Sequence, residues 1–242
     1  MTDVEMSLPA HLEELRTRLI RMVVALFIAF AVCYPNAQAL FEFLLAPLER
    51  AAAPGTDGFG LIGTGVAEAF FTRLKVSFVA ALFLSLPVIL YQTWMFILPG
   101  LKDYEVRYGS GFVIVGTIFF LAGAAFCYEI VFAFGFPFFL AEYRSIGVDP
   151  TIRISEYLSF TSRLLLAFGI TFEMPVAAFF LARVGVITHL TLIEYGRYAF
   201  LATFVLAAIL TPPDVVSQLL MAGPLLLLYG LSIGVAYVFR RR

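Results

Sequence analysis

Long stretches without charged residues alternate with short charged segments along this 242-residue chain. An α-helix rises about 1.5 Å per residue, so about 20 apolar residues cross the roughly 30 Å hydrocarbon core of a bilayer. The pattern therefore predicts an all-α integral membrane protein, with six transmembrane helices in a single membrane domain over residues 1–242. The predicted spans lie at about 20–41, 76–98, 108–134, 160–182, 197–211 and 217–239.

The fifth predicted span is unusually short, because only about thirteen helix-forming residues precede Thr211, Pro212 and Pro213. Such a helix reaches about 20 Å, which is less than the thickness of the hydrocarbon core. Either the bilayer thins beside this helix, or neighbouring helices shield it from lipid. We expect the fifth and sixth helices to form a short hairpin.

A further apolar pattern begins where the first span ends. Five apolar residues recur there at helical spacing: Leu40, Phe41, Leu44, Leu45 and Leu48. This spacing predicts a short helix that lies on the outer face of the bundle, packed on it or at the membrane interface.

The placement of Lys and Arg predicts the orientation of the chain. With the N-terminus inside, the inner segments carry ten Lys and Arg residues and the outer segments carry six. The run Arg240, Arg241 and Arg242 is the strongest single inner anchor. Because positive charge favours the inner side, we expect a multi-pass protein of the plasma (inner) membrane with cytoplasmic N- and C-termini.

Composition agrees with a membrane protein and excludes several other classes. Hydrophobic residues make up 62% of the chain and charged residues 14%, against roughly 25% charged residues in soluble domains. The net charge of −1 argues against nucleic-acid binding. Cys33 and Cys127 lie inside apolar runs, where we expect buried free thiols; a disulfide between them is the alternative.

The motifs of soluble enzymes are missing from the sequence. It contains no Gly-rich phosphate loop followed by Lys and Ser or Thr, and no HExxH, CxxC or nucleophile elbow. With only His11 and His189, we expect no metal site, and we expect no cofactor. An intramembrane enzyme is disfavoured, because no nucleophile is paired with a base at membrane depth.

Glu173 is the most informative residue, because it lies ten residues from both Arg163 and Arg183 and hence near the membrane midplane. An ionised carboxylate there costs roughly 2.5–3.5 kcal/mol on insertion scales. Pro175 frees the carbonyl of Thr171, so Thr171 and Glu173 are expected to form one polar pocket. This pocket is either a docking or proton-sensitive site, or a neutral Glu bonded to the freed backbone.

Acidic residues also stand at the ends of other predicted helices. Glu14 can pair with Arg18 four residues later on an amphipathic first helix, and Glu105 begins the third span. In the outer turn, Asp214 can cap the sixth helix, and Gln218 shares its face one turn later. Capping or ordinary helix-end electrostatics would also explain each of these acids.

Several separated motifs, in the same order, resemble the TatC family, the large subunit of the twin-arginine protein translocase. The resemblance covers nearly the whole chain from about Ser7. The matching segments are His11–Leu19, Ala46–Leu48, Pro87–Pro99, Ala167–Pro175 and Leu210–Gln218.

The resemblance implies a cupped bundle of six spans with both termini inside. It implies a receptor and core subunit of a Sec-independent translocase, which binds twin-arginine signal peptides and exports folded proteins. The expected partners are these signal peptides, small single-span Tat subunits of the TatA and TatB type, and the lipid bilayer, in an oligomeric complex. The resemblance assigns Glu14, Arg16, Phe96 and Glu105 to signal-peptide binding, and it assigns Glu173, Asp214 and Gln218 to the cavity, the outer turn and partner docking.

The placement of the acids is consistent with this role. Carboxylates offer the planar, bidentate acceptors that two adjacent arginines need, and Glu14 and Glu105 stand at the inner ends of different spans. Glu173 would dock a polar group of a partner helix, or change protonation with the membrane potential. The alternative function is a small secondary transporter or channel with an ion site at Glu173, since Pro175 suggests a broken helix.

One segment departs from the family pattern. Glu129 stands where the family more often has an apolar residue, and the nearby proline is shifted to Pro137. The role of the outer end of the third span is therefore inferred less directly from the resemblance. We interpret Glu129 itself as a structural residue at the outer interface.

Overall fold

The computed structural model describes residues 8–52, 61–97, 109–211 and 214–239. Helices dominate these residues, and two short strands join them. The elements are α1 (Leu8–Cys33), η1 (Tyr34–Asn36), α2 (Ala37–Ala51), β1 (Leu61–Ile62), α3 (Glu68–Ile97), α4 (Gly109–Phe126), η4 (Cys127–Val131), α5 (Phe132–Ser145), β2 (Ile152–Arg153), α6 (Ile154–Val184), α7 (His189–Glu194), α8 (Gly196–Leu210) and α9 (Val215–Val238).

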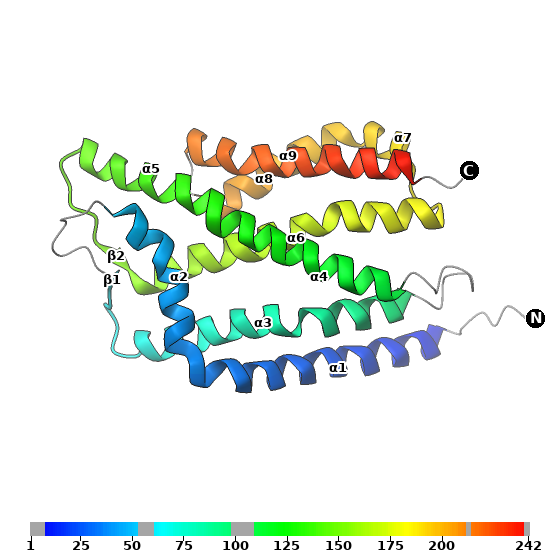
Figure 1. Ribbon diagram of the computed structural model, residues 1–242, viewed down its shortest axis with the longest axis horizontal. Helices are drawn as coiled ribbons and strands as arrows, with labels where there is room; N and C mark the ends of the chain where they lie inside the picture. The colour runs from blue at the N-terminus through cyan, green and yellow to red at the C-terminus, as the bar shows by residue number, and fades with distance from the viewer. Residues whose placement is uncertain (1–7, 53–60, 98–108, 212–213, 240–242) are drawn as a thin grey trace, which may run out of the picture.

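The long helices run roughly along one axis, and both described ends of the chain lie at the same end of the bundle (Figure 1). We call this the terminal end. The strands β1 and β2 lie at the opposite end, which we call the β end (Figure 1). The strands pair in parallel, with Leu61 opposite Ile152 and Ile62 opposite Arg153.

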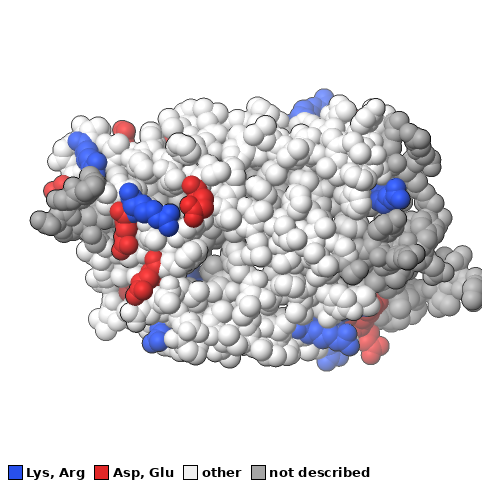
Figure 2. Space-filling view, viewed as in Figure 1, with Lys and Arg blue, Asp and Glu red and all other residues white. Residues whose placement is uncertain are grey.

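The described helices confirm the prediction of an all-α integral membrane protein. Five helical segments are long and apolar enough to cross a membrane, and α8 is a shorter apolar helix. The face in Figure 2 has a broad, largely uncharged band between charged groups toward the two ends. Large apolar side chains such as Phe27, Ile114 and Leu227 are exposed, as expected for a surface solvated by lipid.

The α8–α9 hairpin is uneven in length. Helix α8 has 15 residues, which span only about 22 Å at 1.5 Å per residue. Helix α9 has 24 residues, so it is long enough to cross, although it is the shortest of the long helical segments. The shortness predicted for this hairpin therefore lies mainly in α8, and a sixth complete crossing stays a prediction.

The first predicted span, at 20–41, is not one continuous helix, and its predicted C-terminal end is wrong. Helix α1 stops at Cys33, and Tyr34–Asn36 form a 3-10 turn that contains Pro35. Proline has no backbone N–H and cannot continue the helical hydrogen bonding. The chain then turns sharply into α2 (Figure 1), which buries Leu44 and Leu48 and confirms the predicted short helix.

The third predicted span continues well beyond residue 134. Helices α4 and α5 join through the π-helical turn η4, and the helix runs to Ser145 with Pro137 inside α5. The π turn inserts one residue and rotates the following side chains. It lies at Cys127–Val131 and therefore contains Glu129.

Helices α4 and α6 approach so closely that two glycines are required. A Cβ atom on Gly123 would lie 2.6 Å from the carbonyl oxygen of Phe168, and one on Gly169 would lie 2.7 Å from the Phe120 ring. Small residues at such crossings let helix backbones pack in membranes, where lipid is as apolar as the side chains. Phe132, Phe168 and Met221 are fully buried in the adjoining core.

Glu68, the first residue of α3, joins three segments at the β end. Its carboxylate accepts hydrogen bonds from the backbone N–H groups of Thr64 at 2.5 Å, Gly65 at 3.1 Å and Ser155 at 3.0 Å. Ser155 is the second residue of α6, so Glu68 also satisfies a free N–H at that helix start.

Replacing Gly123 by alanine should destabilise the bundle. The new methyl group meets the Phe168 backbone, which cannot move aside as a side chain could, so a cost of about 1–3 kcal/mol is expected. Thermal unfolding in detergent should show a fall of roughly 5 °C. Gly111→Ala on the same helix is the control, because nothing lies within 4 Å of its Cβ position; equal melting of the two variants would contradict the close crossing.

Replacing Glu68 by glutamine should loosen the β end. The amide has one acceptor oxygen in place of two, and its NH₂ group faces backbone donors. Hydrogen exchange at the Thr64, Gly65 and Ser155 amides should accelerate about tenfold. Glu156→Gln, which alters only an exposed contact to Arg153, is the control; unchanged exchange in the Glu68 variant would refute this role.

Candidate functional site

The first part of the site is a partly buried acid near the start of α1. The carboxylate of Glu14 accepts a hydrogen bond from Arg18 Nε at 3.0 Å, which confirms the pair predicted from their spacing. The side chains of Glu14 and Arg18 are 17% and 11% exposed. Arg18 contacts Oε1, and Oε2 is buried and has no hydrogen-bond partner in the part of the chain that the structure describes. This oxygen is free to accept a further donor.

An aromatic contact joins α1 to α3 beside this acid. His11, three residues before Glu14 and on the same helical face, stacks on Phe96 with ring centroids 4.5 Å apart and planes 23° from parallel. The last described turn of α3 is thereby tied to the first turns of α1 at the terminal end. The sequence alone predicted no role for the His11 side chain.

A buried aromatic cluster holds the end of α3 in place. Trp94 stacks on Phe112 of α4 at 4.9 Å and meets Phe180 of α6 edge-on at 5.0 Å. Trp94 is 3% exposed. The cluster joins three helices two residues before Phe96, so it limits the positions that the Phe96 ring can take.

The other two residues of the predicted signal-peptide site have different outcomes. Arg16 is exposed on α1, and it lies two positions from Glu14, a spacing at which side chains do not face each other on a helix. The structure therefore does not bring Arg16 to the Glu14 carboxylate. Glu105 lies outside the described residues.

The second part of the site is Glu173, inside the bundle. A Cβ atom on Gly116 of α4 would lie 3.1 Å from Glu173 Oε2 and 3.1 Å from Leu90 of α3. The carboxylate therefore packs over a glycine that leaves room for it, toward α3 and α4. Its Oε1 is buried and has no hydrogen-bond partner among the described residues.

The polar pocket predicted around Glu173 is not formed as expected. Helix α6 continues without a break through Pro175, from Ile154 to Val184. The hydroxyl of Thr171 donates to the carbonyl of Ala167 at 2.7 Å, on its own helix, and does not bond to Glu173. The broken helix on which the transporter alternative relied is therefore wrong, and among the described residues no hydroxyl of α6 bonds to Glu173 Oε1.

The α8–α9 hairpin contains the remaining predicted residues. Asp214 caps α9 by accepting from the Ser217 N–H at 2.7 Å, which confirms the predicted cap. Gln218 donates from Nε2 to the carbonyl of Phe204 at 3.1 Å and so ties α9 to α8. Both side chains are used within the hairpin, and neither contacts Glu173 in the described structure.

Sequence reasoning missed the residues that position these acids. Gly116 and Gly123 are seven residues apart, a small-residue spacing that marks one face of a membrane helix and was a readable signal. The contacts of His11 with Phe96 and of Arg50 with Glu129 join distant segments. No local pattern in one sequence reveals such pairs.

Known proteins resemble this chain in sequence and fold. A family profile described as "Sec-independent protein translocase protein (TatC)" matches residues 10–224. The TatC of Desulforapulum autotrophicum is 44% identical over 232 residues, which cover 96% of this chain and 84% of that protein. The TatC of Helicobacter pylori (strain ATCC 700392 / 26695) is 44% identical over 229 residues, which cover 95% and 87%.

Solved structures agree with the sequence comparison. A crystal structure of the "Twin Arginine Translocase Receptor- TatC" superposes with a TM-score of 0.84 at 36% identity, covering 96% of this chain and 100% of that one. A second crystal structure of the receptor, in DDM, has the same TM-score and covers 93% and 99%. The chain therefore belongs to the TatC family of Sec-independent protein translocase proteins.

Proposed function

We propose that this protein is the signal-recognising core subunit of a twin-arginine translocase. It binds the paired arginines of signal peptides, assembles with small single-span partners, and exports folded proteins without covalent chemistry. The terminal end faces the cytoplasm and the β end faces the opposite side of the inner membrane. The excess of Lys and Arg in the segments predicted from the sequence to be inner supports this orientation.

The observation that carries the proposal is the buried Oε2 atom of Glu14, which accepts no hydrogen bond from any described residue. A partly buried carboxylate with an unused acceptor gains more from a guanidinium than an exposed one, because water screens the pair less. Arg18 fixes the orientation of the carboxylate through Oε1. An arginine of the signal peptide would bond to Oε2, with the ring of Phe96 as a neighbouring apolar surface.

Two further residues complete the proposed binding surface. Glu105 supplies the second carboxylate, since two adjacent arginines need two anionic acceptors. Arg16, which points away from Glu14, contacts another part of the peptide or shapes the edge of the site. The apolar part of the peptide then lies along the helices toward the membrane interior.

Glu173 is proposed as a docking group for the transmembrane helix of a partner. Its unpaired Oε1 needs a donor inside the bundle, and a polar side chain on a partner helix would supply one. A change in its protonation would link docking to the proton motive force. Thr171, Gln218 and Asp214 shape the surrounding helices, the last two by fixing the α8–α9 hairpin.

Replacing Glu14 by glutamine should weaken binding of a twin-arginine peptide by about tenfold or more, because a charge-assisted hydrogen bond is lost. Binding is measured by fluorescence anisotropy with purified protein in detergent. Glu13→Gln is the matched control, since Glu13 is an exposed acid on the same turn. Equal affinities for the two variants would refute the role of Glu14.

The same assay tests Glu105. Glu105→Lys should abolish binding of the twin-arginine peptide while the protein still inserts into membranes, because the new ammonium group repels both arginines. A peptide with its two arginines replaced by glutamines sets the background. Undiminished binding in the inserted variant would remove Glu105 from the site.

Replacing Glu173 by alanine should spare peptide binding and weaken partner assembly several-fold, because only the intramembrane acceptor is lost. The measurement is the site-specific crosslinking yield between this protein and a single-span Tat subunit in membranes. Thr161→Ala is the control on the same helix, since its hydroxyl donates to the carbonyl of Tyr157 one turn earlier. Wild-type yield in the Glu173 variant would argue against docking at this residue.

A further inference from the structure

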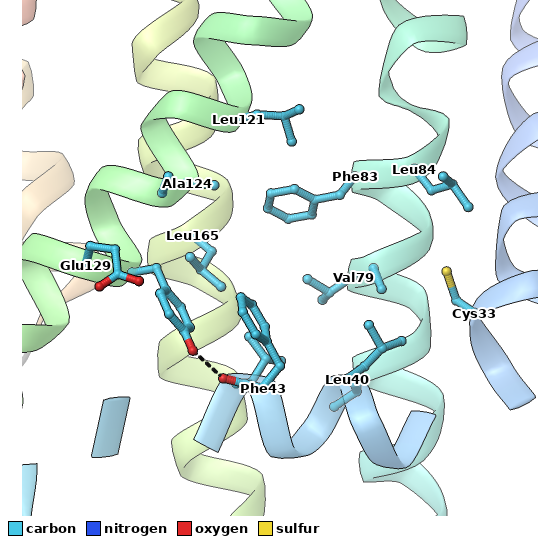
Figure 3. Close-up of a pocket in the computed structure, with 15 residues that line it drawn as sticks. Cys33, Leu40, Phe43, Val79, Phe83, Leu84, Leu121, Ala124, Glu129 and Leu165 are labelled. Carbon is cyan, nitrogen blue, oxygen red and sulfur yellow. Dashed lines mark hydrogen bonds between the residues drawn. The ribbon is translucent and has the colours of Figure 1, made fainter. Parts of the chain in front are cut away.

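An apolar cavity of about 670 Å³ opens between α1, α2, α3, α4 and α6 near the β end. Apart from Cys33, Tyr128 and Glu129, its lining side chains are all Ala, Val, Leu or Phe. The volume is several times the roughly 150 Å³ of an apolar cavity that holds benzene. Figure 3 shows Leu40, Val79, Leu121 and Leu165 around this space and Glu129 at its edge.

The interior of the cavity offers no free hydrogen-bonding group from Tyr128. The Tyr128 hydroxyl donates to the carbonyl of Phe43 at 2.6 Å, and the two rings stack with centroids 4.5 Å apart and planes 3° from parallel. The Tyr128 hydroxyl is therefore polar, but its hydrogen is already donated within the protein. A polar ligand would lose its hydrogen bonds with water in such a space, whereas a hydrocarbon chain would lose nothing.

The rim of the cavity carries one positive and one negative group. Arg50 Nη1 lies 3.5 Å from Glu129 Oε2, and the Arg50 guanidinium lies 5.8 Å from the centre of the Tyr128 ring. The two side chains are 60% and 62% exposed, so the pair is weak and most of its hydrogen-bonding capacity is unused. The rim is thus a dipolar site directly beside an apolar cavity.

We propose that this cavity binds one phospholipid with a phosphate and a primary amine in its headgroup, such as a phosphatidylethanolamine. An acyl chain fills the cavity, the phosphate bonds to the Arg50 guanidinium, and the ammonium group bonds to the Glu129 carboxylate. This charge complementarity selects the occupant. A headgroup with phosphate alone offers Glu129 no cation, and a quaternary ammonium group has no N–H to donate to it.

The inference is independent of signal-peptide recognition, because it uses residues at the β end only. The bound lipid would also occupy the joint between α2 and η4, where the bundle otherwise has a hollow. It would therefore brace α2 against the π turn.

The test is native mass spectrometry of the full chain, delipidated and then mixed with phosphatidylethanolamine or phosphatidylglycerol of identical acyl chains. The wild type should retain one phosphatidylethanolamine, with about fivefold preference over phosphatidylglycerol, the ratio that one exposed charge pair provides. Glu129→Gln should reduce this preference to about one. Glu142→Gln, which alters an exposed acid on α5 outside the cavity, should leave it unchanged.

A second variant tests the cavity itself. Ala125 is exposed and lines the cavity, so Ala125→Phe should fill it and abolish retention of both lipids while the protein elutes as the wild type does. Equal retention of the two lipids by the wild type, or unchanged retention in Ala125→Phe, would overturn the proposal. So would an apolar peptide that displaces the lipid and binds regardless of Glu129.

Discussion

The close crossing of α4 and α6 is the constraint on which the rest of the structure depends. In lipid, burying apolar side chains between helices brings little advantage over leaving them in contact with acyl chains, so association relies on close contact between backbones. Gly123 and Gly169 allow this contact, because any side chain at either position would strike the opposite helix. The same crossing places Gly116 opposite Glu173, so the close approach of α4 and α6 also fixes the position of the intramembrane acid.

The rigid crossing separates two regions with different chemistry. At the terminal end, the Trp94 cluster joins α3 to α4 and α6, and the His11–Phe96 stack joins α3 to the part of α1 that carries the Glu14–Arg18 pair. At the β end, Glu68 and the β1–β2 pair tie the start of α3 to the start of α6. A carboxylate is the organising group in each region. Glu14 keeps an unused oxygen, whereas Glu68 accepts several backbone hydrogen bonds, so the first suits recognition and the second suits structure.

The fold was largely readable from the sequence, and the errors have physical causes. Hydropathy located the apolar helices, because each must satisfy its backbone internally in lipid. The prediction missed the end of α1 before Pro35, because the residues that follow are as apolar as the span itself. The π turn at Cys127–Val131 was not predicted, because its pattern of apolar residues does not differ from that of an α-helix. Pro175 was expected to break α6, but helices in membranes accommodate proline when neighbouring groups compensate.

By itself, the sequence determined the class of the protein, its family, the apolar segments, the Glu14–Arg18 pair and the helix cap at Asp214, since these depend only on composition and on spacing within one helix. Only the tertiary structure decided that Glu173 packs on Gly116 and that Arg50 meets Glu129 beside an apolar cavity. Those contacts depend on how helices far apart in the sequence approach and rotate against one another. In lipid that approach is governed by the shapes of helix surfaces, and a hydropathy pattern does not encode shape.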